Sequence, residues 1–129
     1  MLVDTSALHA LLDRRDPEHE QARQTFQDLV KTHALLTHNY MVLEAIALTQ
    51  RRLGMSAVRA LSEGILPVIE HHWVRPGLHE RAMAALLAAE RSSISLVDWT
   101  SFELMRELNV RTAFAFDADF RAHGFELVP

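Results

Sequence analysis

The sequence of 129 residues contains no cysteine, and this absence removes several kinds of chemistry at once. Disulfide bonds, thiolate zinc sites and a cysteine nucleophile are all excluded. Structural disulfides belong to oxidising compartments, so a chain without them is consistent with a cytoplasmic location. We therefore expect a cytoplasmic protein.

Long apolar runs are also missing from the chain. The least polar long window, residues 32–43, contains two His, two Thr and an Asn, and a membrane span needs about 20 predominantly apolar residues. The N-terminal stretch MLVDTSALHALLDRR has no basic segment ahead of an apolar one, so it does not read as a signal peptide. We expect no membrane association.

Neither sign of charge is in large excess. The net charge is −4 with histidine neutral, which argues against a nucleic-acid coat protein or a basic DNA-binding module. A site made of several carboxylates would itself shift the total toward acid. The acidic balance therefore does not exclude an enzyme that acts on nucleic acid.

Glycine and proline are scarce, with four of each scattered along the chain. No internal repeat, low-complexity tract or linker interrupts the sequence. A chain of this length can bury one core but is short for a two-domain enzyme. We predict a single domain spanning residues 1–129.

Segments with strand and helix patterns alternate along the chain. Strands are predicted at residues 1–3, 34–38, 67–74, 94–97, 112–116 and 125–128. Helices are predicted at residues 5–12, 16–31, 40–53, 56–65, 76–91 and 98–108. This alternation predicts an α/β fold with a central parallel sheet covered on both faces.

Three aspartates directly follow predicted strands. Asp4 follows MLV, Asp98 follows ISLV and Asp117 follows AFAF. Each one alone could be the N-cap of the next helix. Right-handed crossovers, however, bring the carboxyl ends of all parallel strands to one edge of the sheet, where such folds build their sites. Three aspartates at equivalent positions therefore indicate a shared site.

Glu44 is the fourth candidate acid, because it is the only charged residue between His38 and Arg51. It lies in the run YMVLEAIAL, and its neighbours at helical spacing are mostly apolar. Burying a carboxylate there is costly unless the group is paired or coordinated. The alternative is a position at the rim, where the carboxylate reaches water.

Four converging carboxylates would repel one another. At a separation of about 4 Å and an effective dielectric constant of about 20, each pair costs roughly 4 kcal/mol. Such a cluster favours a hard divalent cation, and oxygen ligands favour Mg²⁺ or Mn²⁺ over zinc. The reaction best served by this arrangement is phosphodiester hydrolysis, in which metal ions activate water and neutralise the leaving oxygen.

The four acidic segments together resemble a known family. VDTSAL, THNYMVLEA, SLVDWTSFELMRE and AFAFDADFRAHGFELV are similar, in this order and spacing, to the motifs of PIN-domain nucleases, specifically the VapC-type toxins of toxin–antitoxin pairs. The resemblance covers essentially the whole chain. It implies a three-layer α/β/α PIN-like domain with a central parallel sheet, which cleaves single-stranded or structured RNA.

The resemblance also implies roles and partners. The family forms homodimers and pairs with an antitoxin that lays a helix or an extended segment across an apolar groove, often with a basic side chain in the acidic pocket. The implied catalytic residues, which bind Mg²⁺ or Mn²⁺, are Asp4, Glu44, Asp98 and Asp117. The implied supporting or substrate-contacting hydroxyls are those of Thr5, Ser6 and Ser101.

Asp119 departs from the family pattern, which requires one acid at the last position where this chain has two. It could supplement the site, cap a short helix that runs to His123, or face water. Asp117 is the residue that takes the strand-end place, so we expect Asp117 to matter more.

The acidic segments have two other interpretations, of which the first fails and the second stays open. FAFDADF looks like the DxDx(T/V) motif of haloacid-dehalogenase-type phosphatases, but Phe120 stands where Thr or Val is expected and only nine residues follow it. The remaining alternative is a catalytically inactive PIN-like module that binds RNA or protein. Candidate RNA contacts are Arg14, Arg15, Arg51 and Arg52, although a solvated surface position is the favoured interpretation for each of them.

Overall fold

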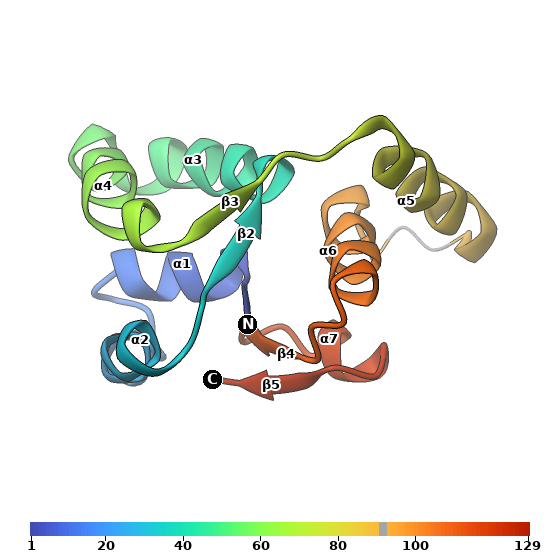
Figure 1. The fold of residues 1–129 in the computed structure, drawn as a ribbon. Coiled ribbons are helices and arrows are strands. Elements are labelled where there is room, and N and C mark those ends of the chain that lie inside the picture. Colours follow the sequence, from blue (N-terminus) through green and yellow to red (C-terminus); the bar gives the residue numbers. More distant parts are fainter. Residues whose placement is uncertain (91–92) are drawn as a thin grey trace.

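Five short strands, all paired in parallel, form one sheet in the computed structural model, which describes residues 1–90 and 93–129 (Figure 1). The order across the sheet is β3-β2-β1-β4-β5, so the first strand lies in the middle. The prediction of a central parallel sheet is confirmed. The strands are β1 (Leu2–Val3), β2 (Leu36–His38), β3 (Glu70–His72), β4 (Thr112–Phe114) and β5 (Glu126–Val128).

Helices cover both faces of this sheet (Figure 1). The α-helices of the described residues are α1 (Thr5–Leu12), α2 (His19–Thr32), α3 (Asn39–Leu53), α4 (Met55–Arg59), α5 (Pro76–Ala89), α6 (Leu96–Glu107) and α7 (Asp119–Ala122). A π-helical turn (η1, Ala60–Ile65) and a 3₁₀ turn (η2, Leu66–Val68) follow α4. The result is the three-layer α/β/α arrangement that was predicted.

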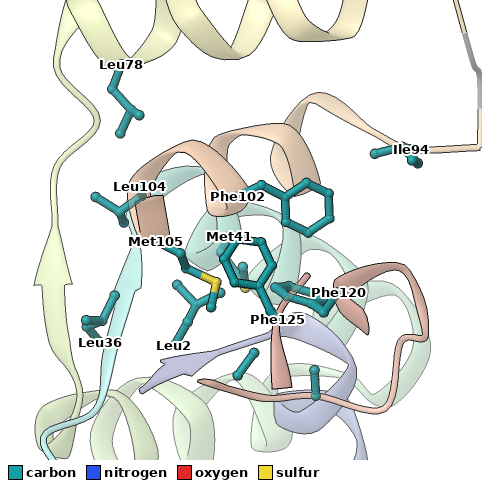
Figure 2. Close-up of a cluster of buried hydrophobic side chains, with 12 residues drawn as sticks. Leu2, Leu36, Met41, Leu78, Ile94, Phe102, Leu104, Met105, Phe120 and Phe125 are labelled. Atoms are coloured by element: carbon teal, nitrogen blue, oxygen red, sulfur yellow. The ribbon is translucent and has the colours of Figure 1, made fainter. Parts of the chain in front are cut away.

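Two apolar cores lie on opposite faces of the sheet, because neighbouring strand residues point to opposite sides. In β1, Leu2 belongs to the core beneath α5, α6 and α7, whereas Val3 belongs to the core beneath α1 and α2. In β4, Ala113 and Phe114 divide in the same way. Figure 2 shows the first core, in which aromatic rings from α6 and the C-terminal segment gather around the central strand. The central strands are thus buried on both faces.

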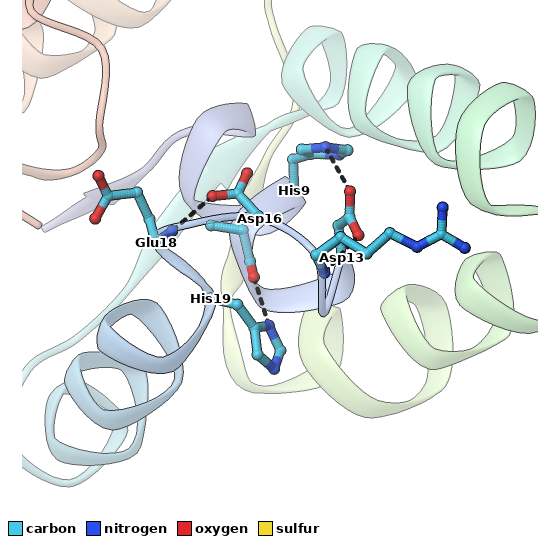
Figure 3. A network of polar contacts seen from close by, with 7 residues as sticks. His9, Asp13, Asp16, Glu18 and His19 are labelled. Carbon is cyan, nitrogen blue, oxygen red and sulfur yellow. Dashed lines mark hydrogen bonds and ion pairs between the residues drawn. The ribbon is translucent and has the colours of Figure 1, made fainter.

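The connection between α1 and α2 explains why α2 begins later than predicted. The Asp13 and Asp16 carboxylates accept the backbone N–H groups of Arg15 and Glu18 at 2.9 and 2.8 Å. These bonds form Asx turns, which compete with helix formation. His19, the first residue of α2, donates from Nδ1 to the Ala10 carbonyl at 2.8 Å (Figure 3). The predicted helix at 16–31 therefore starts at residue 19.

Other boundaries shift for local reasons. Gly54 ends α3 as predicted, with a positive φ of 86° that glycine adopts without strain. The predicted helix at 56–65 changes from α to π form at Ala60. The 3₁₀ turn at Leu66–Val68 includes the first residues of the predicted strand 67–74. Within that range only Glu70–His72 form a strand. The last residue of the predicted helix 76–91 lies outside the described residues.

The predicted strand at residues 94–97 was wrong. Leu96 already begins α6, and Ser95 is its N-cap. Ser95 and Asp98 form a capping box, in which each side chain bonds to the backbone N–H of the other residue. Ile94 is buried in the apolar core without being part of a strand. A short apolar run is ambiguous between strand and helix, and here the capping signal decides it.

Candidate functional site

Asp4 ends the central strand and caps the first helix. Its backbone N–H donates to the Phe114 carbonyl, and its side-chain Oδ2 accepts from the backbone N–H of Ser6 at 3.0 Å. The Ser6 hydroxyl donates to the same oxygen. Only 5% of Asp4 is exposed. The expectation that Asp4 follows a strand is confirmed, and the cap serves to hold the carboxylate in place.

Burial makes the charged form of Asp4 unfavourable. Desolvation raises the pKa of Asp4 from 3.8 to about 6, and the bonds from Ser6 oppose part of that rise. The carboxylates of Asp98 and Asp117 raise the pKa of Asp4 further. Asp4 therefore lies within electrostatic reach of both acids, as a common site requires.

Asp98 reaches the site from the first turn of α6. It does not follow a strand, so that part of the prediction was wrong. Its Oδ2 accepts from the backbone N–H and the hydroxyl of Ser95 at 3.1 and 3.0 Å. The N-terminus of a helix favours a nearby negative charge. Even so, partial burial raises the pKa of Asp98, and Asp117 and Asp119 add to the rise.

Asp117 and Asp119 approach from the segment that follows β4. Asp117 lies three residues beyond the end of β4, so the prediction that it directly follows the strand was wrong. Its Oδ1 accepts the backbone N–H of Asp119 at 2.9 Å. Oxygens of Asp98, Asp117 and Asp119 lie within 4.8 Å of one another, and all three residues are half-buried. We call these three residues the aspartate cluster. Asp119, which has no equivalent in the predicted pattern, is thus a full member of it.

The Ser6 hydroxyl fixes this segment relative to Asp4. It accepts the backbone N–H of Phe116 at 3.0 Å while donating to Asp4. One hydroxyl therefore joins the buried carboxylate to the backbone immediately before Asp117. This is a supporting role of the kind expected for Ser6.

Glu44 lies at the rim. As a residue it is exposed, which is the alternative that the sequence left open. Partial burial of its carboxyl group nevertheless raises its pKa, and the charge of Asp98 contributes. Thr5 opposes that rise, although its hydroxyl makes no hydrogen bond of normal geometry. Glu44 and Thr5 are therefore neighbours, with Glu44 at the exposed rim and Thr5 buried beside it.

Thr5 and Ser101 differ in what they can contact. Thr5 is 8% exposed, and its hydroxyl has no hydrogen-bond partner among the described residues. Ser101 is fully buried, donates to the Val97 carbonyl at 3.1 Å and pairs with Nε2 of His38 at 2.8 Å. Ser101 therefore supports α6 and does not contact substrate in this conformation.

The sequence interpretation missed Ser95 and His38. Ser95 has a readable signal, because Ser-x-x-Asp before an apolar run predicts a capping box. His38 has none, because the sequence does not say which helices its ring will meet.

The donor set of the aspartate cluster fits a hard divalent cation. Carboxylate oxygens are the ligands that Mg²⁺ and Mn²⁺ prefer. The unsatisfied hydroxyl of Thr5, buried beside Glu44, is a further oxygen that a bound water could satisfy. The carboxylates can therefore hold a cation, and the Thr5 hydroxyl can bind a water molecule.

Two of the arginines proposed as RNA contacts line a hollow to which none of these acids contributes. Arg14 and Arg15 line a hollow of about 770 Å³ between the end of α1, the start of α2 and α4. Leu11, Leu12, Leu53 and Ile65 give this hollow an apolar wall.

Among the described residues, no helix is long and apolar enough to cross a membrane.

Comparison with known proteins identifies the family of this arrangement. The model of the PIN domain matches residues 1–126. The 23S rRNA-specific endonuclease VapC20 of Mycobacterium tuberculosis is 34% identical over 126 residues, which are 97% of this chain and 95% of the relative.

Solved structures agree with this result. The crystal structure of M. tuberculosis VapC20, described as a sarcin-ricin loop cleaving toxin, superposes with a TM-score of 0.85 at 35% identity. It covers 96% of this chain and 95% of its own. FitAcB from Neisseria gonorrhoeae superposes with a TM-score of 0.66 at 16% identity, covering 99% and 96% of the two chains, and shows likeness of fold alone.

Proposed function

This chain belongs to the PIN-domain family, and we propose that it is a metal-dependent endoribonuclease that acts as the toxin of a toxin–antitoxin pair. The observation that carries the proposal is the aspartate cluster, with its carboxylate oxygens within 4.8 Å of one another. The identity to an endonuclease across 97% of the chain supports the reaction type. We propose further that residues 1–129 act as one nuclease domain.

In this proposal Asp98, Asp117 and Asp119 bind Mg²⁺ or Mn²⁺, and Asp4 lies behind them as a buried ligand or charge partner. When bound, the cation would activate water and neutralise the leaving oxygen of the phosphodiester. Glu44, at the exposed rim, is suited to complete the metal pocket directly or through a bound water, and the buried Thr5 hydroxyl beside it is suited to hold that water. The catalytic residues that we propose are therefore the four predicted acids together with Asp119.

The proposed substrate is ribosomal RNA. The relative is named for 23S rRNA, and its structure is described as that of a toxin that cleaves the sarcin-ricin loop. A synthetic sarcin–ricin stem-loop is therefore the first substrate to test. An enzyme with this substrate works in the cytoplasm, where ribosomes are.

Cleavage of this stem-loop by wild type and Asp98→Asn, each in Mg²⁺, Mn²⁺ and EDTA, tests the proposal. We expect the wild type to cleave with either metal and to stop in EDTA, and the variant to be inactive. Asp28→Asn is a matched control, because it makes the same change on the exposed surface of α2. Equal cleavage by Asp98→Asn and wild type would contradict the proposal.

The second candidate is an inactive PIN-like module that binds RNA or protein. RNA that is bound by wild type but not cut in either metal would favour this alternative. The five acids near one site argue against it, because an interaction module has no need of mutually repelling carboxylates.

The partners that we propose are an antitoxin and a second copy of the chain. The apolar wall of the hollow between α1, α2 and α4 offers a surface of the kind an antitoxin helix needs. Copurification of the chain with the product of an adjacent small gene, and its mass in solution, test the two partners separately.

A further inference from the structure

His38 is a fully buried histidine at a junction of three elements. It is the last residue of β2 and the N-cap of α3, where its Nδ1 accepts the backbone N–H of Met41 at 3.2 Å. Its Nε2 lies 2.8 Å from the Ser101 hydroxyl on α6. The ring therefore contacts both helices at once.

The protons in this chain of bonds have one consistent arrangement. Nδ1 accepts from a backbone N–H, so the proton of the neutral ring is on Nε2, which donates to Ser101 Oγ. The Ser101 hydroxyl then donates its own proton to the Val97 carbonyl at 3.1 Å. Burial lowers the pKa of His38 to about 3, and His71 and His72 contribute, so the ring stays neutral.

The two helices joined by this ring both carry acids of the site. Glu44 lies on α3, six residues after the cap that His38 provides. Asp98 lies on α6 directly after Val97, whose carbonyl ends the chain of bonds. The charge of Asp98 acts on Glu44, so the two acids are close enough for their separation to matter.

We propose that His38 is a positioning residue that sets the separation of Glu44 and Asp98, because it directly precedes the helix of the first and its ring bonds through Ser101 to the helix of the second. The proposal rests on the proposed metal-dependent function. It differs from a packing role, since an apolar side chain of similar size would fill the same space without linking the helices. A buried imidazole is otherwise a cost that its two hydrogen bonds must offset.

Two substitutions at His38 separate its two contacts. His38→Asn places an acceptor where Nδ1 lies but cannot reach Ser101, so it retains the cap and loses the link. His38→Gln reaches toward Ser101 but gives up the cap. We expect His38→Asn to raise the Kd for Mn²⁺ about tenfold, the lower end of the range for supporting residues of metal sites. His38→Gln should lower the Tm yet keep the Kd within about threefold.

Ser101→Ala tests the same link from the other side, and Thr100→Val is its matched control. Thr100 is also buried on α6 and donates to the carbonyl four residues earlier, at 2.7 Å, but it has no bond to His38. We expect Ser101→Ala to weaken Mn²⁺ binding about as much as His38→Asn does, and Thr100→Val to leave the Kd within twofold. Calorimetric titration with MnCl₂ measures the Kd without RNA.

Two results would overturn the proposal. One is a Kd for Ser101→Ala equal to that of Thr100→Val, and the other is retention of affinity by His38→Asn with loss by His38→Gln. Failure of the proposed function is seen separately, as wild type that binds no Mn²⁺. In that case two other measurements test the link between His38 and Ser101. The ¹⁵N chemical shifts of His38 show which ring nitrogen carries the proton, and a proton on Nδ1 would overturn the link. Amide hydrogen exchange in the first turn of α6 should be faster in Ser101→Ala, and unchanged exchange would also overturn it.

Discussion

Serines hold both Asp4 and Asp98 at the N-terminus of a helix, but the two aspartates occupy different positions of the capping motif. Asp4 is itself the N-cap of α1 and accepts from Ser6, two residues later. Asp98 lies inside the first turn of α6 and accepts from Ser95, the N-cap three residues earlier. In both cases the bonds fall on Oδ2. Two local capping motifs thus hold carboxylates near enough for the charge of Asp98 to raise the pKa of Asp4.

The two aspartates differ in their surroundings. Asp4 is buried, and its pKa rises to about 6, whereas Asp98 is half-buried at the margin of the cluster. A buried carboxylate beside other carboxylates costs stability when no cation is bound. Asp4 is therefore the more strongly desolvated carboxylate, and Asp98 is the more accessible of the two for the cation that we propose.

The largest expected effect is on activity. Asp4→Asn and Asp98→Asn should each reduce cleavage of the sarcin–ricin stem-loop at least about 100-fold, because each removes a charge from the metal site. The variants should differ in stability, since Asp4→Asn also removes a buried charge and should not lower the Tm measured in EDTA. Initial cleavage rates and thermal melts measure both quantities. An active Asp4→Asn would show that the cap, and not the charge, is what this position supplies.

The next effect is the dependence of stability on pH. Because the pKa of Asp4 is about 6 in the folded protein and returns to its ordinary value of 3.8 on unfolding, the unfolded chain releases this proton at lower pH. The contribution of Asp4 to stability is therefore present below about pH 4 and is lost as the pH rises to about 6. At 1.36 kcal/mol per pKa unit the loss is roughly 3 kcal/mol.

Urea denaturation of wild type and Asp4→Asn between pH 4 and 7, in EDTA, measures this loss. The difference in unfolding free energy between the two proteins should move in favour of the variant as the pH rises. Asp28→Asn serves as the exposed control. Parallel curves for wild type and Asp4→Asn would mean that Asp4 titrates normally.

A smaller difference is expected between Asp117 and Asp119. Both belong to the aspartate cluster, but the charge of Asp117 acts on both Asp4 and Asp98, whereas that of Asp119 acts on Asp98. We expect Asp117→Asn to raise the Kd for Mn²⁺ several times more than Asp119→Asn does, with both above wild type. Calorimetric titration of the two variants decides. A larger effect of Asp119→Asn would reverse the order that the sequence pattern implies.

The smallest effect concerns the serines. Ser95→Ala should cost about 1 kcal/mol of stability, the usual value for loss of an N-cap, and Ser95→Thr should recover most of it. Ser6→Ala is different, because it removes the bond to buried Asp4 and leaves the Phe116 N–H without its acceptor. Its loss of stability in urea should exceed that of Ser95→Ala. Equal losses would mean that the Phe116 bond adds nothing.

The sequence predicted much of the fold because the apolar periodicities are strong. The alternation of strands and helices and the stop at Gly54 follow from local signals, whereas the central position of β1 is known only from the structure. The prediction failed at residues 94–97 because four residues are too few to show a strand or helix period, and Ser95 is the N-cap from which α6 begins. Local sequence patterns thus predict the presence of helices and strands better than they predict their first and last residues.

The site was predicted in part for the same reason. Asp4 and its cap could be read from adjacent residues, whereas the closeness of Asp119 to Asp98 depends on a turn that no pattern specifies. His38 joins α3 to α6 across 63 residues of sequence, and only the packed structure brings its ring to Ser101. Long-range contacts are what the single sequence could not supply.

The most direct test of the account is the melting temperature of wild type and Asp98→Asn with and without saturating MnCl₂. A ligand at about 100 times its Kd stabilises a folded protein by roughly 2.7 kcal/mol. We predict that Mn²⁺ raises the Tm of wild type by several degrees and leaves that of Asp98→Asn nearly unchanged. An unchanged Tm for wild type would contradict the claim that these carboxylates form a metal site.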